Sequence, residues 1–169
     1  SFYLNPMHDR RAMDAVWQIC ADVQPHAIIL LGDMLDLADM STKYPRPMDL
    51  INTSQPAILE MAWWCRWLRQ LCPSSTLTYM AGNHEERLER LTIEKAQMTQ
   101  GLHGAGEQLP ALAIERLLDL ESIDIEYVKP FGADYWLWSD TPSPVKIHPG
   151  EIVRDTVRKT DALPLHHNH

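Results

Sequence analysis

Long apolar runs are missing from this sequence of 169 residues. No segment approaches the roughly 20 consecutive apolar residues with which a helix crosses a bilayer. The first residues also lack the basic stretch followed by an apolar one that marks a secretory signal. We therefore expect a soluble protein of the cytoplasm, with no membrane-spanning segment.

Cysteine is scarce, with three residues in the whole chain. Because this number is odd and Cys20, Cys65 and Cys72 fall inside helical patterns, the sequence argues against a disulfide framework. The three residues do not resemble a zinc knuckle either. We predict that they are buried thiols.

Positive charge is also in short supply, since 15 lysines and arginines face 23 aspartates and glutamates and leave a net charge of −8. This balance disfavours a protein that holds long nucleic acid by neutralising its phosphates alone. It does not exclude a phosphate-bearing substrate, because bound cations would reverse the sign of the field inside a pocket. The sequence has no internal repeat, and we expect a single globular domain over residues 1–169.

What the sequence does contain is an uninterrupted apolar run at 27–31 that stops at Gly32, Asp33 and Asp36. Such a run without polar alternation fits a strand covered on both faces, as in a parallel sheet. The chemistry of these sheets lies just beyond the carboxyl ends of the strands. We therefore predict an α/β fold in which Asp33 follows a buried strand.

Two more predicted strands end in polar side chains. Residues 76–81 lead to Asn83 and His84, and residues 145–147 lead to His148. Carboxylate and amide oxygens suit hard divalent ions, and imidazole suits zinc, iron, nickel and manganese in mixed shells. The three strand ends together therefore predict a metal site.

The spacing of these residues also suggests separate roles. Asp33 is suited to bridge two ions, which would clamp a phosphate and activate the attacking water. Asn83 offers a neutral carbonyl oxygen, and His84 would be free to donate a proton to the leaving group. Asp36, three residues past Asp33, is better placed to orient a ligand or a water.

The remaining pattern predicts further elements around this centre. They are helices over 9–23, 56–71, 85–91 and 109–120, a half-exposed strand over 123–128, and a strand over 135–138 as its hairpin partner or neighbour. We expect Asp9 to be the N-cap of the first helix. The long loop at 37–54 suggests a lid or a substrate-facing insertion.

The helix at 56–71 carries Trp63, Trp64 and Trp67. A crossover helix must cover the sheet, so we expect these rings to pack mostly in the core, with one of them partly exposed. A recognition stripe on the surface is the alternative.

Two blocks of the sequence carry a family resemblance. Gly32-Asp33-x-x-Asp36 and Gly82-Asn83-His84-Glu85 resemble the second and third signature blocks of the calcineurin-like metallophosphoesterases, and the chain is similar to bacterial and phage-type members. The resemblance implies a layered α/β sandwich in which mixed β-sheets are flanked by α-helices. It further implies a dinuclear metal centre that hydrolyses phosphomonoesters or phosphodiesters.

The same resemblance implies a role for individual residues. Asp33 would be the bridging ligand, Asn83 a ligand to one ion, and His84 the catalytic imidazole. His148 resembles the isolated histidine of the family's fourth block. The tail offers His167-x-His169 in the pattern of the fifth block, although a histidine-rich tail is also what a purification tag looks like.

The first block of the family, Asp-x-His, is missing at the expected place. Its two positions fall on Phe2 and Leu4, which cannot coordinate a metal. Either the block lies upstream of Ser1, or it is lost, or His8 substitutes for it. The sequence leaves open whether the domain is truncated at both ends.

These observations lead to one expected function and one rival. We expect a metal-dependent phosphoesterase with two divalent ions, manganese as first choice and iron, zinc or nickel as alternatives. Its substrate would be a phosphate ester of a small molecule, a nucleotide or single-stranded nucleic acid. The rival is a degenerate member of the family that has lost hydrolysis and serves as a binding or scaffolding module. Oligomeric state and the choice between monoester and diester stay open.

Overall fold

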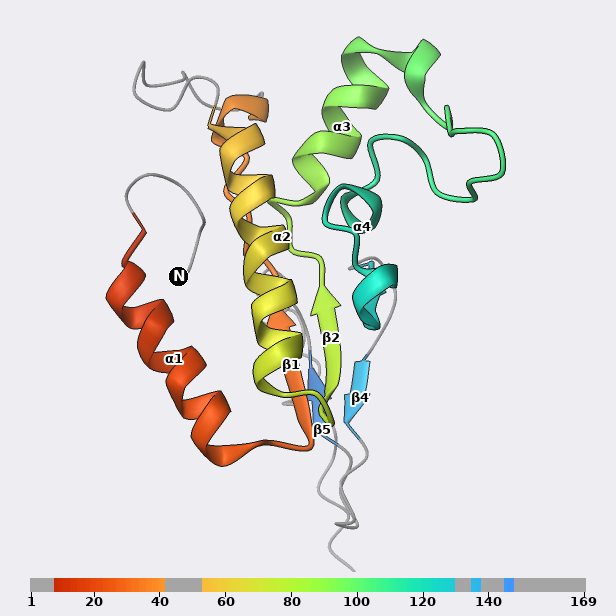
Figure 1. Ribbon diagram of the computed structural model, residues 1–169. Coiled ribbons are helices and arrows are strands. Elements are labelled where there is room, and N and C mark those ends of the chain that lie inside the picture. The colour runs from red at the N-terminus through yellow and green to blue at the C-terminus, as the bar shows by residue number, and fades with distance from the viewer. Residues whose placement is uncertain (1–7, 42–52, 130–134, 138–144, 148–169) are drawn as a thin grey trace, which may run out of the picture.

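The computed structural model describes residues 8–41, 53–129, 135–137 and 145–147. Figure 1 shows how the elements are arranged. The α-helices are α1 (Arg10–Val23), α2 (Ser54–Leu71), α3 (Glu86–Lys95) and α4 (Ile114–Leu117). The strands are β1 (Ala27–Leu31), β2 (Thr76–Met80), β3 (Ile125–Val128), β4 (Tyr135–Leu137) and β5 (Val145–Ile147). Short 3₁₀ turns lie at η1 (Ala38–Met40), η3 (Gln97–Thr99) and η4 (Glu121–Ile123).

The first three strands form a parallel sheet in the order β1-β2-β3. Ala27 pairs with Thr76 at the start of β1, and Leu31 pairs with Met80 at its end. The parallel strand pairs need crossover connections, and α2 supplies the one between β1 and β2. The predicted α/β fold with a parallel sheet is therefore confirmed. The prediction that the strand at 27–31 is covered on both faces was wrong, because only Leu30 of β1 is buried and Leu31 is 51% exposed.

The strand predicted over 135–138 has a different partner from the expected one. β4 pairs antiparallel with β5 in a separate two-stranded sheet, with Tyr135 opposite Ile147 and Leu137 opposite Val145. The prediction that it pairs with or neighbours the strand at 123–128 was therefore wrong. Short alternating segments carry no information about which strand they join, so only the element itself was predictable.

One face of the parallel sheet packs against α2. The register places Ile28, Leu30, Leu77, Tyr79 and Ile125 on the same face of the sheet. These side chains belong to the hydrophobic core, together with residues of α2 that are essentially inaccessible to solvent: Met61, Cys65 and Leu68. The carboxyl ends of β1 and β2 are thus held at a fixed separation by a packed core.

The N-terminal helix begins where the sequence predicted. Asp9 has extended backbone, and its Oδ1 accepts from the backbone N–H groups of Arg11 (3.0 Å) and Ala12 (3.2 Å). At the other end Gln24 adopts a left-handed conformation, and its Nε2 donates to the carbonyl of Leu71 at 2.8 Å. The end of α1 is thereby tied to the end of α2.

Replacing Asp9 with alanine should destabilise the protein by about 1 kcal/mol, because two N–H groups at the start of α1 lose their acceptor. The free energy of unfolding in urea measures this loss. Asp14→Ala is the matched control, since Asp14 is an exposed residue inside the same helix. Equal stability of the two variants would show that the cap contributes nothing.

The tryptophans of α2 do not pack as expected. Trp64 is buried and stacks on Trp17 of α1, with ring centroids 5.5 Å apart. Trp63 and Trp67 are 54% and 41% exposed and stack on one another with nearly parallel rings. The expectation of a single partly exposed ring was wrong. Residues 63 and 67 are four apart and share one helix face, and that face points away from the core.

Three helix predictions were also wrong in their bounds, and the helix predicted over 85–91 runs over Glu86–Lys95. α2 begins at Ser54, two residues before Pro56, and the carboxylate of Asp39 accepts from both the backbone N–H and the hydroxyl of Ser54. The helix predicted over 109–120 is reduced to the single turn Ile114–Leu117. Ala113 has extended backbone just before this turn, and Asp119 is left-handed just beyond its end.

The thiol prediction holds for two residues and partly for the third. Cys65 and Cys72 are buried, Cys20 is half-buried, and all three are free thiols. Burial raises the pKa of Cys65 to about 12, which keeps this thiol protonated near neutral pH. Among the described residues, every helix is too short or too polar to span a bilayer.

Candidate functional site

The loops that follow β1 and β2 touch through two glycines. Gly32 is left-handed (φ +69°), and a Cβ on it would lie 3.0 Å from the Cα of Gly82. A Cβ on Gly82 would lie only 2.2 Å from Oδ1 of Asp33 and 2.3 Å from its backbone nitrogen. The two strand ends approach this closely because neither position carries a side chain.

Asp33 has an unusual backbone at the point of contact. Its φ of +51° lies in the left-handed region that residues with a Cβ seldom adopt. Its Oδ1 accepts the backbone N–H of His84 at 2.9 Å. The carboxylate is therefore held against the loop after β2, at some cost in backbone strain.

The side chain of Asn83 lies against the same carboxylate. With its amide nitrogen turned toward Asp33, Asn83 donates to Oδ2 at 3.0 Å and to Oδ1 at 3.1 Å. With the amide turned over, its oxygen would face these two oxygens instead. Three converging oxygens repel one another unless a cation lies between them, so rotation of one amide converts a hydrogen-bonded pair into a set of cation ligands.

Glu85 links the loop after β1 to the loop after β2. Its side chain is almost inaccessible to solvent (2% exposed), and its carboxylate accepts four hydrogen bonds. Oε2 accepts from the backbone N–H groups of Asp33 (3.0 Å) and Gly82 (2.8 Å). Oε1 accepts from the backbone N–H of Leu35 (3.0 Å) and the hydroxyl of Tyr79 (2.8 Å). One buried carboxylate therefore fixes both strand ends relative to each other.

The hydroxyl of the buried Tyr79 donates to Glu85. Burial and the negative charge of Glu85 hold the pKa of Tyr79 well above its usual value. The phenol consequently stays a hydrogen-bond donor to the carboxylate at all ordinary pH values. Sequence reasoning missed Glu85, because in Glu85-Glu86-Arg87-Leu88-Glu89 it looks like one of several surface charges in a first helical turn.

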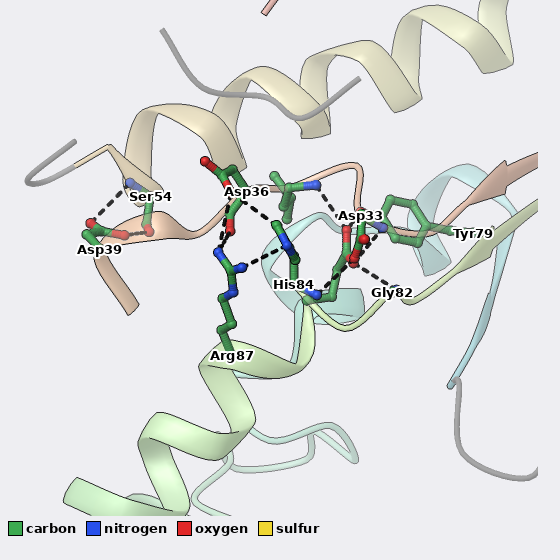
Figure 2. A network of polar contacts seen from close by, with 10 residues as sticks. Asp33, Asp36, Asp39, Ser54, Tyr79, Gly82, His84 and Arg87 are labelled. Carbon is green, nitrogen blue, oxygen red and sulfur yellow. Dashed lines mark hydrogen bonds and ion pairs between the residues drawn. The ribbon is translucent and has the colours of Figure 1, made fainter. Parts of the chain in front are cut away.

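The imidazole of His84 lies between the side chains of Asp36 and Arg87, as Figure 2 shows. Its Nδ1 is 3.1 Å from Oδ1 of Asp36, and its Nε2 is 2.7 Å from Nη2 of Arg87. Arg87 also donates through Nη1 to the backbone oxygen of Asp36 (2.7 Å) and to its Oδ1 (3.3 Å). Asp36, His84 and Arg87 thus form a closed ring of polar contacts.

The structure brings some of the predicted site residues together. Asp33, Asn83 and His84 meet at the carboxyl ends of β1 and β2, and Asp36 contacts His84, where it orients the ring. Arg87 was not anticipated, because its place in the sequence suggests only a charged residue on a helix. The predicted ligands His148, His167 and His169 lie outside the described residues.

His8 does not complete the missing first block within the described part of the chain. Its Nε2 lies 3.8 Å from Oε1 of Glu60, on α2. No three His, Cys, Asp or Glu side chains among the described residues gather as a metal-binding group. The described donors for a cation at this point are therefore the carboxylate of Asp33 and the amide oxygen of Asn83.

A separate cavity of about 350 Å³ lies beside α3, away from these donors. The residues that line it include Leu88, Thr92, Ile114 and Glu85. Asp33, Asn83 and His84 do not line it. The contacts at the strand ends, and not this cavity, therefore define the candidate site.

Comparison with protein-family models, with curated proteins and with solved structures found no match for this chain. The function proposed below consequently depends on the two sequence blocks and on the geometry at the strand ends.

Proposed function

We propose that this chain is a metal-dependent phosphoesterase of the cytoplasm, built as a layered sandwich of the calcineurin-like metallophosphoesterase type. The observation that carries this proposal is the meeting of Asp33, Asn83 and His84 at the carboxyl ends of two parallel strands. Ligands and catalytic groups of open α/β sheets collect at this edge. The substrate is a phosphate ester of a small molecule, a nucleotide or single-stranded nucleic acid.

The donor chemistry at this edge fits a divalent cation. Asp33 and Asn83 offer carboxylate and amide oxygens at one point, and Mn²⁺ accepts such oxygens together with imidazole. Two oxygen donors are too few for one ion, so the proposal requires His148, His167 and His169 to complete the set. A bound pair of ions supplies a water of lowered pKa and a positive field for the phosphate.

The chain's own residues supply the orientation around the cations. Oδ1 of Asp36 lies 3.1 Å from Nδ1 of His84, which favours a position of the imidazole next to this carboxylate. The backbone N–H of His84 in turn donates to Oδ1 of Asp33, so the carboxylate from the loop after β1 is tied to the loop after β2 that carries the imidazole. In this arrangement His84 assists the departing alcohol while Asp33 and Asn83 hold the cation.

The rival is a binding or scaffolding module that has lost hydrolysis. It is favoured by the small number of ligands, since Phe2 and Leu4 replace the first block and the described residues hold no group of three acidic, cysteine or histidine ligands. The two proposals differ in metal content and in turnover, and both quantities can be measured on one sample.

Two substitutions should separate the roles at the site. His84→Ala should lower kcat by about 100- to 10,000-fold with a chromogenic phosphate ester, and it should leave the manganese content nearly unchanged. Asp33→Asn should lower both manganese content and turnover, because it removes a ligand charge. Metal analysis and steady-state kinetics on the full chain provide the measurements.

His103→Ala is the control, since His103 is exposed and lies far along the chain from the strand ends. It should retain wild-type metal content and turnover. A wild-type chain that binds no manganese and hydrolyses neither a monoester nor a diester would support the binding module instead.

A further inference from the structure

Arg87 occupies a position that the mechanism above does not use. It lies in the first turn of α3, and its guanidinium contacts Asp36 through Nη1 and His84 through Nη2. The side chains of these three residues are each at most 19% exposed. The guanidinium is thus partly removed from water and lies beside the groups that face the proposed substrate.

The donors of Arg87 determine which ring nitrogen of His84 carries the hydrogen. A guanidinium has donors and no acceptor, so Nε2 of His84 must accept the contact from Nη2 of Arg87 at 2.7 Å. The ring hydrogen then lies on Nδ1, which faces the carboxylate of Asp36 at 3.1 Å. In this state Arg87 covers the nitrogen of His84 that would otherwise face a leaving group.

Arg87 also has a donor group that its contacts with Asp36 and His84 do not use. Nη1 contacts the backbone oxygen and Oδ1 of Asp36 and Nη2 contacts His84, whereas Nε makes no hydrogen bond to another described residue. Nε and Nη2 lie along one edge of the planar group, where arginine binds two oxygens of an anion at once. Phosphate oxygens are stronger acceptors than a neutral imidazole because they carry charge.

We propose that Arg87 is a substrate-binding residue that takes an anionic, non-bridging oxygen of the phosphate and leaves His84 when it does so. This inference rests on the proposed function, because it concerns the same site. It restricts the substrate to esters that carry such an oxygen, and it excludes neutral carboxylic esters. Binding of the phosphate then exposes Nε2 of His84, which takes up a proton from solvent before it can give one to the departing alcohol.

The test uses inorganic phosphate as the probe and the full chain loaded with manganese. Arg87→Ala should weaken phosphate binding by about 10- to 100-fold, measured by calorimetry and as the inhibition constant of phosphate. The KM for a chromogenic phosphate ester should rise by a similar factor, with a smaller change in kcat. Arg87→Lys should recover part of the binding, because it keeps the charge and loses the planar fork.

Arg90→Ala is the matched control. Arg90 lies one turn further along α3, is exposed and pairs with Glu86 at 2.7 Å, so its removal changes the charge of the helix without touching His84. It should leave phosphate binding within about twofold of the wild type, as surface pairs contribute little. Circular dichroism shows whether each variant is folded.

A spectroscopic measurement separates binding from mere orientation of His84. In ¹⁵N-resolved spectra of the wild type loaded with diamagnetic Zn²⁺, the hydrogen of His84 should lie on Nδ1 without phosphate, and the Nε2 signal should change with phosphate. Unchanged phosphate binding in folded Arg87→Ala, with only kcat reduced, would overturn the inference. So would a wild type that binds no phosphate. Binding that depends on Arg87 in a chain without turnover would support the inference and contradict the proposed function.

Discussion

Replacing Glu85 with glutamine should lower the free energy of unfolding by about 3 kcal/mol, although the two side chains have the same shape. The carboxylate accepts four hydrogen bonds, whereas glutamine offers one oxygen and turns an NH₂ group toward the other two donors. Each buried donor left without an acceptor costs about 1–3 kcal/mol. For a domain of this size the midpoint of thermal unfolding should fall by roughly 6–12 °C.

The control for this experiment is Glu89→Gln. Glu89 is exposed on the same helix, so its substitution removes the same charge and should change stability by less than about 0.5 kcal/mol. Urea unfolding followed by tryptophan fluorescence gives both values. If the two variants unfold at the same urea concentration, the buried carboxylate does not hold the loops together.

Gly82→Ala should have an effect of similar or greater size on both stability and metal binding. The new methyl group would lie 2.2 Å from Oδ1 of Asp33 and 2.3 Å from its backbone nitrogen. The backbone cannot rotate away as a side chain can, so the loops after β1 and β2 must separate. We expect a loss of about 3 kcal/mol or more and a manganese content well below that of the wild type.

Gly104→Ala is the matched control for the added methyl group. A Cβ at that position would meet the end of the Glu107 side chain at 2.8 Å, and this exposed side chain can move aside. The stability of this variant should stay within about 1 kcal/mol of the wild type. Calorimetric titration with Mn²⁺ and urea unfolding test both variants. Normal manganese binding by Gly82→Ala would mean that the close approach of the two loops is not needed for the site.

The sequence predicted the centre of this fold because its signals are local. The apolar runs at 27–31 and 76–80 became parallel strands, and the polar residues that follow them met at one edge of the sheet. Asp33, Asn83 and His84 could be found in this way because their positions follow from where two strands end. The same local reasoning located the N-cap at Asp9.

What could not be predicted depends on contacts between distant parts of the chain. Glu85 contacts Asp33 and Leu35 some fifty positions earlier, and only the meeting of two loops shows that its charge is buried. The same holds for Arg87, whose partners include Asp36. The exposure of Trp63 depends on which faces of α2 receive neighbours, and a helical pattern alone does not contain that information.

Under the proposed ligand role of Asp33, its backbone sets stability and metal binding against each other. At φ +51° the backbone of a residue with a Cβ is less stable than that of glycine by about 1–2 kcal/mol. Laboratory evolution for heat resistance alone would therefore favour glycine at position 33, whereas evolution for turnover would retain the aspartate. If the proposed ligand role is correct, stabilised versions of this protein are best built with position 33 held constant.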